Sequence, residues 1–422
     1  MRLDLSAPPP ADANCVISLK LDGRTIASQS VTLTHQRQKT SIYLKEFEHG
    51  QARKHLVWSP ESPNLIDAEI TISTPAGTAQ DHCQSYFGMR SCAVEGQRFL
   101  LNDAPYFVRS VLSQGFWPQS HLAAPSNEAI RREVELIKAL GFNAVRNHQK
   151  VEDPRFLYWC DQLGLLVWGE MPSAYEYSTR MVTQVTTEWL EVIERDRSHP
   201  CVVTWVPINE SWGVTDIARR PEQQAFATSL YALTKAMDPS RPVISNDGWE
   251  HTKSDILGVH DYSAIGEHLR QRYCSRSSIA AAFAHFGPQR RRLALTGADL
   301  DNLPVMITEF GGISYRPASG QAWFGYSTVT TPEEYIAALE ELIGALHASP
   351  ELAGYCYTQL TDTLQETNGL LDENRQPKLP LERIHAMISR PSEAIRTEYL
   401  DQARNAASAI SQARPDASGK HD

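Results

Sequence analysis

The sequence predicts a multidomain protein: a small all-β immunoglobulin-like sandwich followed by a (β/α)8 TIM barrel. Up to about residue 90, apolar residues recur with a period of two and no segment carries a helical stripe. Beyond residue 105, apolar runs alternate with amphipathic helical segments, the pattern of a parallel sheet covered by helices. We therefore place the sandwich at 1–90, the barrel at 91–395 and a disordered tail at 396–422.

The first domain is expected to consist of short antiparallel strands. Apolar residues two apart lead to Asp22-Gly23, a pair typical of a two-residue hairpin. Similar apolar pairs mark further strands at 31–33, 42–44 and 70–72, between polar turns. This composition indicates a structural module without chemistry of its own.

Eight apolar runs after residue 105 are expected to be the barrel strands. They are 106–111, 142–146, 165–170, 201–208, 242–246, 256–260, 305–308 and 353–358. Helical stripes are expected at 126–140, 153–163, 183–197, 223–237, 331–347 and 381–389. Residues 264–303 show no clear period, so we expect a long loop over the barrel mouth. Eight strand-and-helix units predict a (β/α)8 barrel.

Composition and charge narrow the class of function. The net charge of −10 and the pI near 5.8 argue against nucleic acid or an anionic membrane as the main partner. No apolar run approaches the ~20 residues of a membrane helix, and the first residues lack the apolar core of a secretory signal. The seven cysteines are scattered without CxxC spacing, which is typical of reduced thiols in a cytoplasmic protein. A homo-oligomer is compatible with these features.

Polar residues end almost every predicted barrel strand. The clearest case is TWVPINESWG (204–213), where an apolar run stops at Asn209-Glu210. The other strand ends carry Arg146, Asn147 and His148; Glu170; Asn246 and Asp247; His260, Asp261 and Tyr262; Glu309; and Thr358 and Gln359. Because a barrel presents its chemistry at the C-terminal ends of its strands, these residues predict an active site at the mouth.

Glu210 and Glu309 are the predicted catalytic pair. Glycoside hydrolysis needs one carboxyl group that protonates the leaving oxygen and one that attacks the anomeric carbon. The fourth and seventh strands lie on roughly opposite sides of a small barrel, so the two side chains can converge. Asn209 can donate a hydrogen bond to a sugar hydroxyl, and Tyr262 can hydrogen-bond Glu309. The alternative for either carboxylate alone is a salt-bridged residue at the rim.

Several segments resemble glycoside hydrolase family 2, which contains β-galactosidases, β-glucuronidases and β-mannosidases. RDRSHPCVVTWVPINES (195–211) resembles the acid/base signature of this family, and FNAVRNHQKVEDPRFLYWCDQLGLLVWGE (142–170) its other signature. VMITEFGG (305–312) is similar to the nucleophile strand. LVWSPESPNL (56–65) and SYFGMR (85–90) resemble the end of the family's immunoglobulin-like domain.

The resemblance implies a retaining mechanism on a carbohydrate substrate, with Glu210 as acid/base and Glu309 as nucleophile. It also implies that the sugar contacts Asn209, Arg146, His148, His260 and Tyr262. Glu170 at the third strand end and Trp117 after the first strand are further candidates for the sugar site. Between the two glutamates, we expect a raised pKa for Glu210 and an ionised Glu309, held by hydrogen bonds from Tyr262 and Arg146.

The sequence departs from the family pattern at four places. No jelly-roll sugar-binding domain precedes the sandwich, and one residue rather than two separates His148 from Arg146. YTQLTD (357–362) lacks the Trp on which many members stack the sugar, a role left to Tyr357 or Trp323. The Asn-x-Lys with which glucuronidases bind the sugar carboxylate is missing near NGLLDENRQPK (368–378), which favours a neutral hexose such as galactose.

Three other interpretations stay open. The chain is alternatively a truncated, catalytically silent carbohydrate-binding remnant, a β-glucuronidase or β-mannosidase, or a barrel enzyme of different chemistry such as a metal-dependent hydrolase. No cluster of ligands in the sequence indicates a metal, and no cofactor is expected, although some family members hold Mg²⁺ near the site. The basic run at 289–292 is expected to be a solvated loop, and His199 at a strand start a structural residue.

Overall fold

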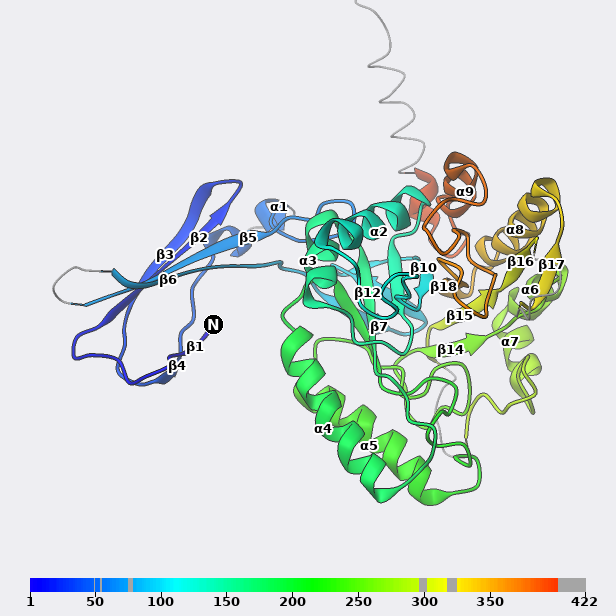
Figure 1. Cartoon of the computed structure of the whole chain (residues 1–422), viewed down its shortest axis with the longest axis horizontal. Helices are drawn as coiled ribbons and strands as arrows, with labels where there is room; N and C mark the ends of the chain where they lie inside the picture. Colours follow the sequence, from blue (N-terminus) through cyan, green and yellow to red (C-terminus); the bar gives the residue numbers. More distant parts are fainter. Residues whose placement is uncertain (49, 54, 75–78, 296–301, 317–324, 401–422) are drawn as a thin grey trace, which may run out of the picture.

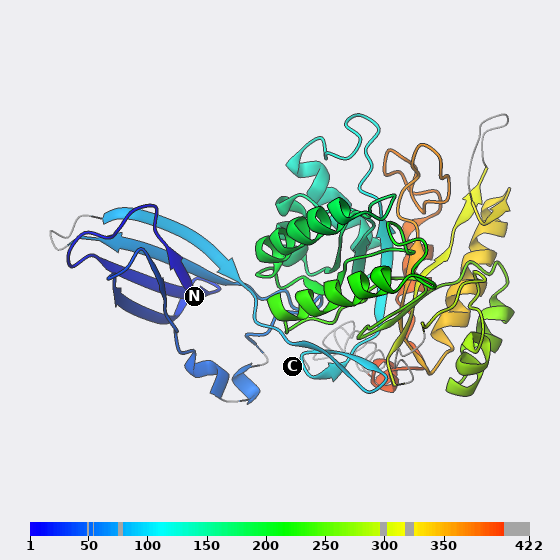
Figure 2. The same cartoon turned by 90° about the horizontal axis from the view of Figure 1, so that it is seen from below.

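The computed structural model describes residues 1–48, 50–53, 55–74, 79–295, 302–316 and 325–400. Figures 1 and 2 show an antiparallel β-domain that stands beside a larger domain built around a parallel sheet. The predicted Trp323 and residues 401–422 lie outside the described part of the chain.

The N-terminal domain is a small sandwich. One sheet has the order β3-β2-β5-β6, and β1 pairs with β4. The strands are β1 (Arg2–Asp4), β2 (Asn14–Leu21), β3 (Arg24–Thr32), β4 (Arg37–Lys39), β5 (Ile66–Ser73) and β6 (Ala79–Phe87). Asp22 and Gly23 have φ of 49° and 75°, so the predicted hairpin turn is confirmed. The strand predicted at 42–44 is wrong, since this stretch has no regular structure and leads into η1 (Lys45–Glu48) and α1 (Gly50–Arg53).

The barrel sheet contains seven parallel strands in the order β13-β12-β11-β10-β18-β15-β14. They are β10 (Val108–Ser113), β11 (Ala144–Asn147), β12 (Leu166–Glu170), β13 (Val202–Val206), β14 (Leu257–His260), β15 (Val305–Gly311) and β18 (Leu352–Thr358). The eighth predicted strand is an irregular segment. Residues 242–247 run parallel to β13 through the bridges Trp205–Val243 and Asn209–Asp247.

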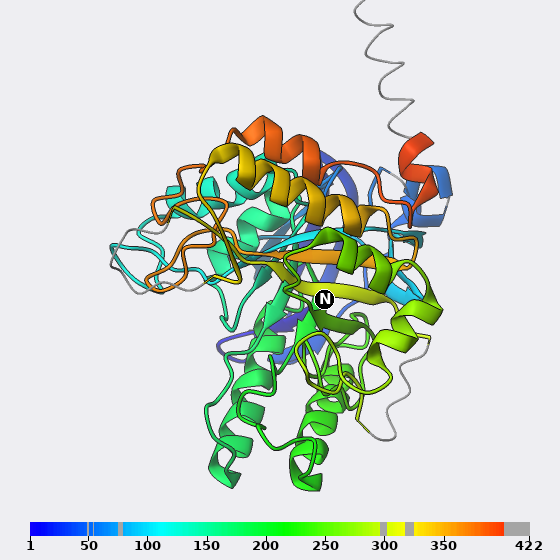
Figure 3. The same ribbon diagram turned by 90° about the vertical axis from the view of Figure 1, so that its right-hand side faces the viewer.

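Helices cover the outside of the parallel sheet (Figure 3). They are α2 (Asn127–Ala139), α3 (Pro154–Leu163), α4 (Thr179–Asp196), α5 (Pro221–Met237), α6 (Gly266–Tyr273), α7 (Arg276–Phe283), α8 (Pro332–His347) and α9 (Leu381–Ile388). The long loop predicted at 264–303 is therefore wrong, since α6 and α7 occupy its first half. The tail predicted from residue 396 also begins differently: residues 396–400 are helical, and Glu398 forms an ion pair with Arg109 at 2.6 Å.

Two smaller sheets complete the second domain. β7 (Cys92–Glu95), β8 (Arg98–Leu101) and β9 (Ala104–Pro105) form an antiparallel sheet, and Cys92 contacts the carbonyl of Val203 in β13 at 3.6 Å. β16 (Ile313–Tyr315) pairs with β17 (Ser327–Val329) beyond the end of β15. Among the described residues, no helix is long and apolar enough to cross a membrane.

Strand register brings the predicted polar residues to one level of the barrel. Ser113 pairs with Asn147, His260 with Glu309, and Gly311 with Thr358. Because all these strands are parallel, their C-terminal ends open on the same side, and the polar residues at those ends face a common mouth.

Candidate active site

A cavity of about 480 Å³ opens at the C-terminal ends of the barrel strands. Its wall contains both predicted catalytic residues, Glu210 and Glu309, together with His148, Asn209 and Tyr262. The same wall includes the exposed aromatic residues Tyr175 and Trp212 and the amide and carboxyl groups of Gln114, Gln365 and Glu366. A pocket with convergent polar groups and a few aromatic side chains is typical of a small-molecule site.

Glu210 occupies an unusual backbone turn a short distance beyond the end of β13. Glu210 and Ser211 have φ of 52° and 57°, in the left-handed region that residues with a side chain rarely adopt. The surroundings hold this turn: the Glu210 N–H donates to the carbonyl of Asp247, and the Ser211 N–H donates to Asn246 Oδ1, both at 2.9 Å. The turn directs the Glu210 carboxylate to His260, whose Nδ1 lies 2.6 Å from Glu210 Oε1.

Glu309 lies across the cavity from Glu210 and is nearly buried. Arg146 donates to Glu309 Oε1 at 2.9 Å, and the Tyr262 hydroxyl donates to Oε2 in a short hydrogen bond. One oxygen of Glu210, one oxygen of Glu309 and one ring nitrogen of His260 all lie within 4.8 Å of one another. The two predicted catalytic carboxylates therefore meet, as the strand ends indicated.

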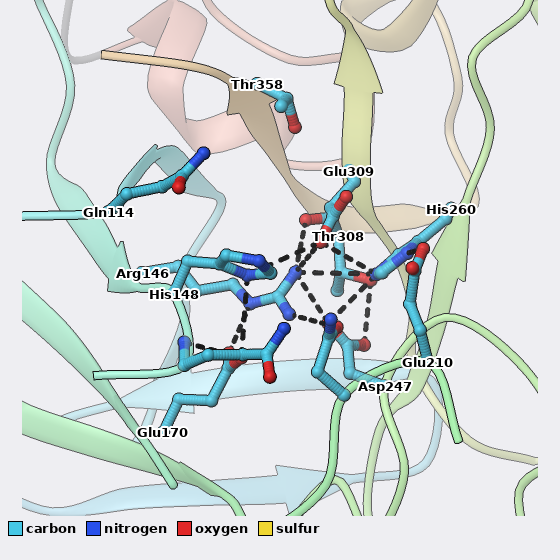
Figure 4. Close-up of polar contacts among 12 residues, drawn as sticks. Gln114, Arg146, His148, Glu170, Glu210, Asp247, His260, Thr308, Glu309 and Thr358 are labelled. Atoms are coloured by element: carbon cyan, nitrogen blue, oxygen red, sulfur yellow. Dashed lines mark hydrogen bonds and ion pairs between the residues drawn. The ribbon is translucent and has the colours of Figure 1, made fainter. Parts of the chain in front are cut away.

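Arg146 is the centre of a buried polar network (Figure 4). Its guanidinium is fully buried and contacts Glu170 at 2.7 Å, Asp247 and Glu309 at 2.9 Å, and Asn209 Oδ1 at 2.7 Å. Arg146 therefore fixes the position of one cavity carboxylate and one cavity amide at once. A bidentate cation is suited to this role because its donors have a rigid planar geometry.

His260 links the two sides of the network. It contacts Glu210 through Nδ1 and Asp247 through Nε2 at 3.3 Å. Burial alone lowers the pKa of His260, but the charge of Glu309 and the hydrogen bonds to Asp247 and Glu210 outweigh it and raise the pKa to about 10. Burial acts to raise the pKa of Asp247, yet the charges of Arg146 and His260 bring it below its ordinary value. His260 is thus a cation at neutral pH, and Asp247 is an anion.

The surroundings of Glu309 act on its ionisation in both directions. Tyr262 and Arg146 do donate to Glu309, as predicted. Burial nevertheless raises the pKa of Glu309 to about 7, against the opposing charges of His260 and Arg146, and the neighbouring Glu210 adds to the rise. The charge of Glu210 and the protonation of Glu309 are therefore coupled.

His148 and Glu170 contribute in different ways. His148 lines the cavity, with Nδ1 3.8 Å from Glu309 Oε1 and 3.5 Å from Glu170 Oε1. Burial, together with the charges of Arg146 and His260, holds the pKa of His148 well below its usual range, so the ring is neutral. Glu170 is buried behind Arg146 and accepts from the Gln149 N–H at 2.9 Å. The structure therefore places Glu170 behind the cavity wall, as a support for Arg146.

Two aromatic residues predicted to stack on the sugar lie elsewhere. Tyr357 is fully buried, and its ring packs edge-on against Phe310 at 5.5 Å. Trp117 is 7% exposed, and the guanidinium of Arg375 covers its ring at 3.4 Å. Neither residue lines the cavity. Both predictions of a stacking platform are wrong for this cavity.

Sequence reasoning missed several residues of the site. Asp247 was visible as a polar strand end, but its partnership with Arg146 and His260 was not. Tyr175 and Trp212 form an edge-on pair at 5.9 Å on the cavity rim, and the Trp directly after Asn-Glu-Ser was the available signal. Glu366 lies in an irregular loop after β18, where no pattern marks it.

Two groups of side chains among the described residues have the spacing of metal ligands. One is Glu210, His260 and Glu309 in the cavity, where a cation could bind only if His260 lost its positive charge. The other is Asp161, His199 and Cys201. There Asp161 already accepts from Tyr86 at 2.9 Å and from the Cys201 N–H at 2.9 Å, besides its 2.6 Å contact with His199. These contacts account for Asp161 as a structural acceptor.

Comparison with known families and proteins gives consistent matches along the chain. A family model described as "Glycosyl hydrolases family 2, TIM barrel domain" matches residues 92–273, and one described as "Glycosyl hydrolases family 2" matches residues 3–90. A β-galactosidase of Vibrio cholerae is 29% identical over 259 residues, which are 58% of this chain and 24% of that protein. A putative β-glucuronidase of Formosa agariphila is 27% identical over 233 residues, or 53% and 28% of the two chains. The aligned part is about a quarter of the length of these relatives.

Solved structures share the fold over most of the chain. A GH2 β-galacturonidase from Eisenbergiella tayi, bound to galacturonate, has a TM-score of 0.66 at 19% identity and covers 89% of this chain and 66% of its own. A β-glucuronidase of Parabacteroides merdae has a TM-score of 0.71 at 18% identity and covers 90% of this chain and 48% of its own. At such identities the likeness concerns the fold.

Proposed function

This chain belongs to glycoside hydrolase family 2, and from this premise we propose that it hydrolyses terminal β-linked neutral sugars by a retaining mechanism. β-Galactosides are the first substrates to test. The observation that carries the proposal is the approach of Glu210 and Glu309 to within 4.8 Å at the base of the cavity. Retaining enzymes hold their carboxyl groups ~5–5.5 Å apart, whereas inverting enzymes leave ~6.5–9.5 Å for a water molecule.

In the first step, Glu309 attacks the anomeric carbon and Glu210 protonates the departing oxygen. The hydrogen bonds from Arg146 and Tyr262 orient the Glu309 carboxylate toward the sugar. Glu210 has to carry a proton when Glu309 attacks. The charge of Arg146 and the hydrogen bond from Tyr262 favour this arrangement because both stabilise an anionic Glu309.

In the second step, Glu210 is ionised and acts as the base for a water molecule that hydrolyses the glycosyl-enzyme. Asn209 lines the cavity while its Oδ1 accepts from Arg146 at 2.7 Å, which leaves its amide nitrogen for a sugar hydroxyl. Tyr175 and Trp212 at the rim supply an aromatic surface for the leaving group.

A panel of nitrophenyl β-glycosides tests the activity. Turnover of the galactoside, insensitive to a chelator, is the expected result. No turnover of any glycoside, with galactose still bound, would favour the catalytically silent remnant. Loss of activity with the chelator would favour a metal-dependent enzyme, and preferred turnover of a glucuronide or mannoside would change the proposed specificity.

Variants of Glu210 and Glu309 test which of them is the acid/base and which is the nucleophile. Glu309→Gln should abolish turnover of every substrate, by about 10³-fold or more, because no covalent intermediate can form. Glu210→Ala should keep the first step for dinitrophenyl glycosides, whose leaving group hardly needs a proton, and slow the second step. Azide, which needs no base, should then rescue Glu210→Ala and yield a β-glycosyl azide, measured by product NMR. Rescue of Glu309→Ala to a β-product, or release of an inverted sugar, contradicts the assignment.

A further inference from the structure

A third carboxylate, Glu366, lines the cavity but has no part in the two steps above. It lies in the loop after β18, on the same wall as Gln114 and Thr358. We propose that Glu366 is a specificity residue that selects sugars offering hydrogen-bond donors at this wall and excludes uronic acids, which bring a carboxylate there. This inference rests on the proposed function, since it concerns the sugar that the glycosidase cavity accepts.

Neutral side chains hold Glu366 in place. The Gln359 side-chain nitrogen donates to Glu366 Oε2 at 2.9 Å and to Asn368 Oδ1 at 2.8 Å. The Gln359 side-chain oxygen in turn accepts from Gln114 at 3.0 Å. These amides fix the direction of the carboxylate without cancelling its charge.

No cation compensates Glu366 within the described part of the chain. None of the ion pairs there includes it, and Lys378, on the same loop, is bound to Asp362 at 2.6 Å and to the carbonyl of Thr367 at 3.3 Å. The described wall of the cavity contains no Lys or Arg, and its histidine, His148, is neutral. Arg146 and His260 are already bound to Glu309 and Glu210 and do not line the described wall, so Glu366 is its carboxylate without an ion pair, and no Lys or Arg there can bind a sugar carboxylate.

The surroundings already disfavour negative charge at this wall. Burial raises the pKa of Glu366, and the charge of Glu210 adds to the rise, while hydrogen bonds from Asn368 and Gln114 act against it. A sugar hydroxyl that donates to the carboxylate of Glu366 adds a hydrogen bond to the one from Gln359. A uronate at the same place adds a like charge in a partly desolvated cavity, which weakens binding by about tenfold or more.

Binding of free sugars tests the inference without any turnover. We would titrate galactose and galacturonate into the wild type, Glu366→Gln and Glu373→Gln at pH 8, and compare the Kd ratio of the two sugars. The wild type is expected to prefer galactose by about tenfold or more, and Glu366→Gln to reduce this preference by about tenfold, chiefly through tighter galacturonate binding. Glu373, an exposed acid on the same loop that does not line the cavity, is the charge-matched control, and its variant should keep the wild-type ratio.

The glutamine can still accept from Gln359, so the loop is expected to stay folded, which thermal unfolding checks. A Kd ratio that Glu366→Gln leaves unchanged, equal binding of both sugars by the wild type, or no binding of either sugar overturns the inference. If galactose is preferred and the ratio responds to Glu366→Gln while no glycoside is turned over, the proposed function fails and the selectivity assigned to Glu366 stands.

Discussion

At the residue scale, the buried site holds more negative than positive groups. Arg146 and His260 are its cations, while Glu170, Asp247, Glu210 and Glu309 supply four carboxyl groups within the same network. Two cations cannot balance four anions in a site removed from water, so at least one carboxyl group retains a proton near neutral pH. The pKa values of Glu170 and Glu309 are both raised, so these two carboxyl groups are the candidates to hold that proton, and a proton near Glu309 agrees with the proposed mechanism.

The pH dependence of kcat/KM follows from the raised pKa of Glu309. As the proposed nucleophile, Glu309 attacks only when ionised, so kcat/KM for a nitrophenyl galactoside should fall as the pH drops through an apparent pKa of about 7. Glu210→Gln removes the neighbouring charge that raises this pKa. With a dinitrophenyl galactoside, the acidic limb of this variant should therefore move to lower pH. An acidic limb at the same pH in both proteins would show that Glu210 and Glu309 are not coupled.

At the scale of elements, the arginine-rich segment 289–292 does more than face solvent. Arg290 and Arg292 are exposed, as expected, but Arg291 donates to the buried Glu250 at 2.8 Å. The same Glu250 oxygen accepts from the Ser211 hydroxyl at 2.6 Å. Backbone hydrogen bonds join the two segments, from the Glu250 N–H to the Arg292 carbonyl and from the His251 N–H to the Leu293 carbonyl, both at 2.8 Å. Arg291 therefore supports the strained turn that carries Glu210.

Arg291→Ala tests this support. The variant leaves the Glu250 carboxylate buried without its cation and loosens the turn at Ser211, so kcat should fall by about tenfold while KM changes little. Because the turn positions the proton donor, the loss should be larger for nitrophenyl than for dinitrophenyl glycosides. Arg292→Ala, which removes an exposed charge from the same segment, is the control. An equal loss for both leaving groups would point to general destabilisation instead.

Most of the barrel strands, but not all of the helices, could be predicted from the sequence. Seven barrel strands were recognisable because each is a buried apolar run followed by a polar end. Residues 242–247 read as an eighth strand, but on their outer side the Asp255 carboxylate and the Ser254 hydroxyl bind the backbone N–H groups of Val243 and Ser245. These side chains replace a second ladder of backbone bonds. α6 and α7 escaped prediction because each is only eight residues long, and α6 is mostly polar.

Strand alternation explains the success and failure of the site predictions. Thr358 at the end of β18 lines the cavity, so Tyr357, one residue earlier, points to the opposite face and packs against Phe310. A search for strand ends finds Glu210 and Glu309 but does not separate neighbouring residues by face. Glu366 belongs to an irregular loop, whose path depends on tertiary contacts and leaves no period in the sequence.

At the scale of the whole molecule, the sandwich and the barrel are joined by specific polar contacts. Arg90 follows the last strand of the sandwich and donates to two carbonyls at the start of β13, those of Pro200 at 2.9 Å and Val202 at 2.5 Å. Tyr86 in β6 donates to Asp161 at the end of α3 at 2.9 Å. The first family model ends at residue 90 and the second begins at residue 92, which agrees with a junction there. The domain division at residue 90 stays a prediction, and these contacts specify what holds its two sides together.

Arg90→Ala should destabilise the protein by about 2–4 kcal/mol, because two carbonyls at the start of β13 lose charged donors in a largely desolvated place. Chemical denaturation followed by tryptophan fluorescence measures this change. Arg90→Lys should recover only part of the loss, since one ammonium cannot reproduce the fork that spans both carbonyls.

Arg37→Ala is the control, because the Arg37 side chain is 87% exposed on the sandwich and should change stability by no more than about 0.5 kcal/mol. A loosened start of β13 should lower the unfolding midpoint of the barrel while the sandwich, with its separate core, unfolds as before. Unchanged unfolding of Arg90→Ala would show that the hydrogen bonds of Arg90 do not contribute to holding the two domains together.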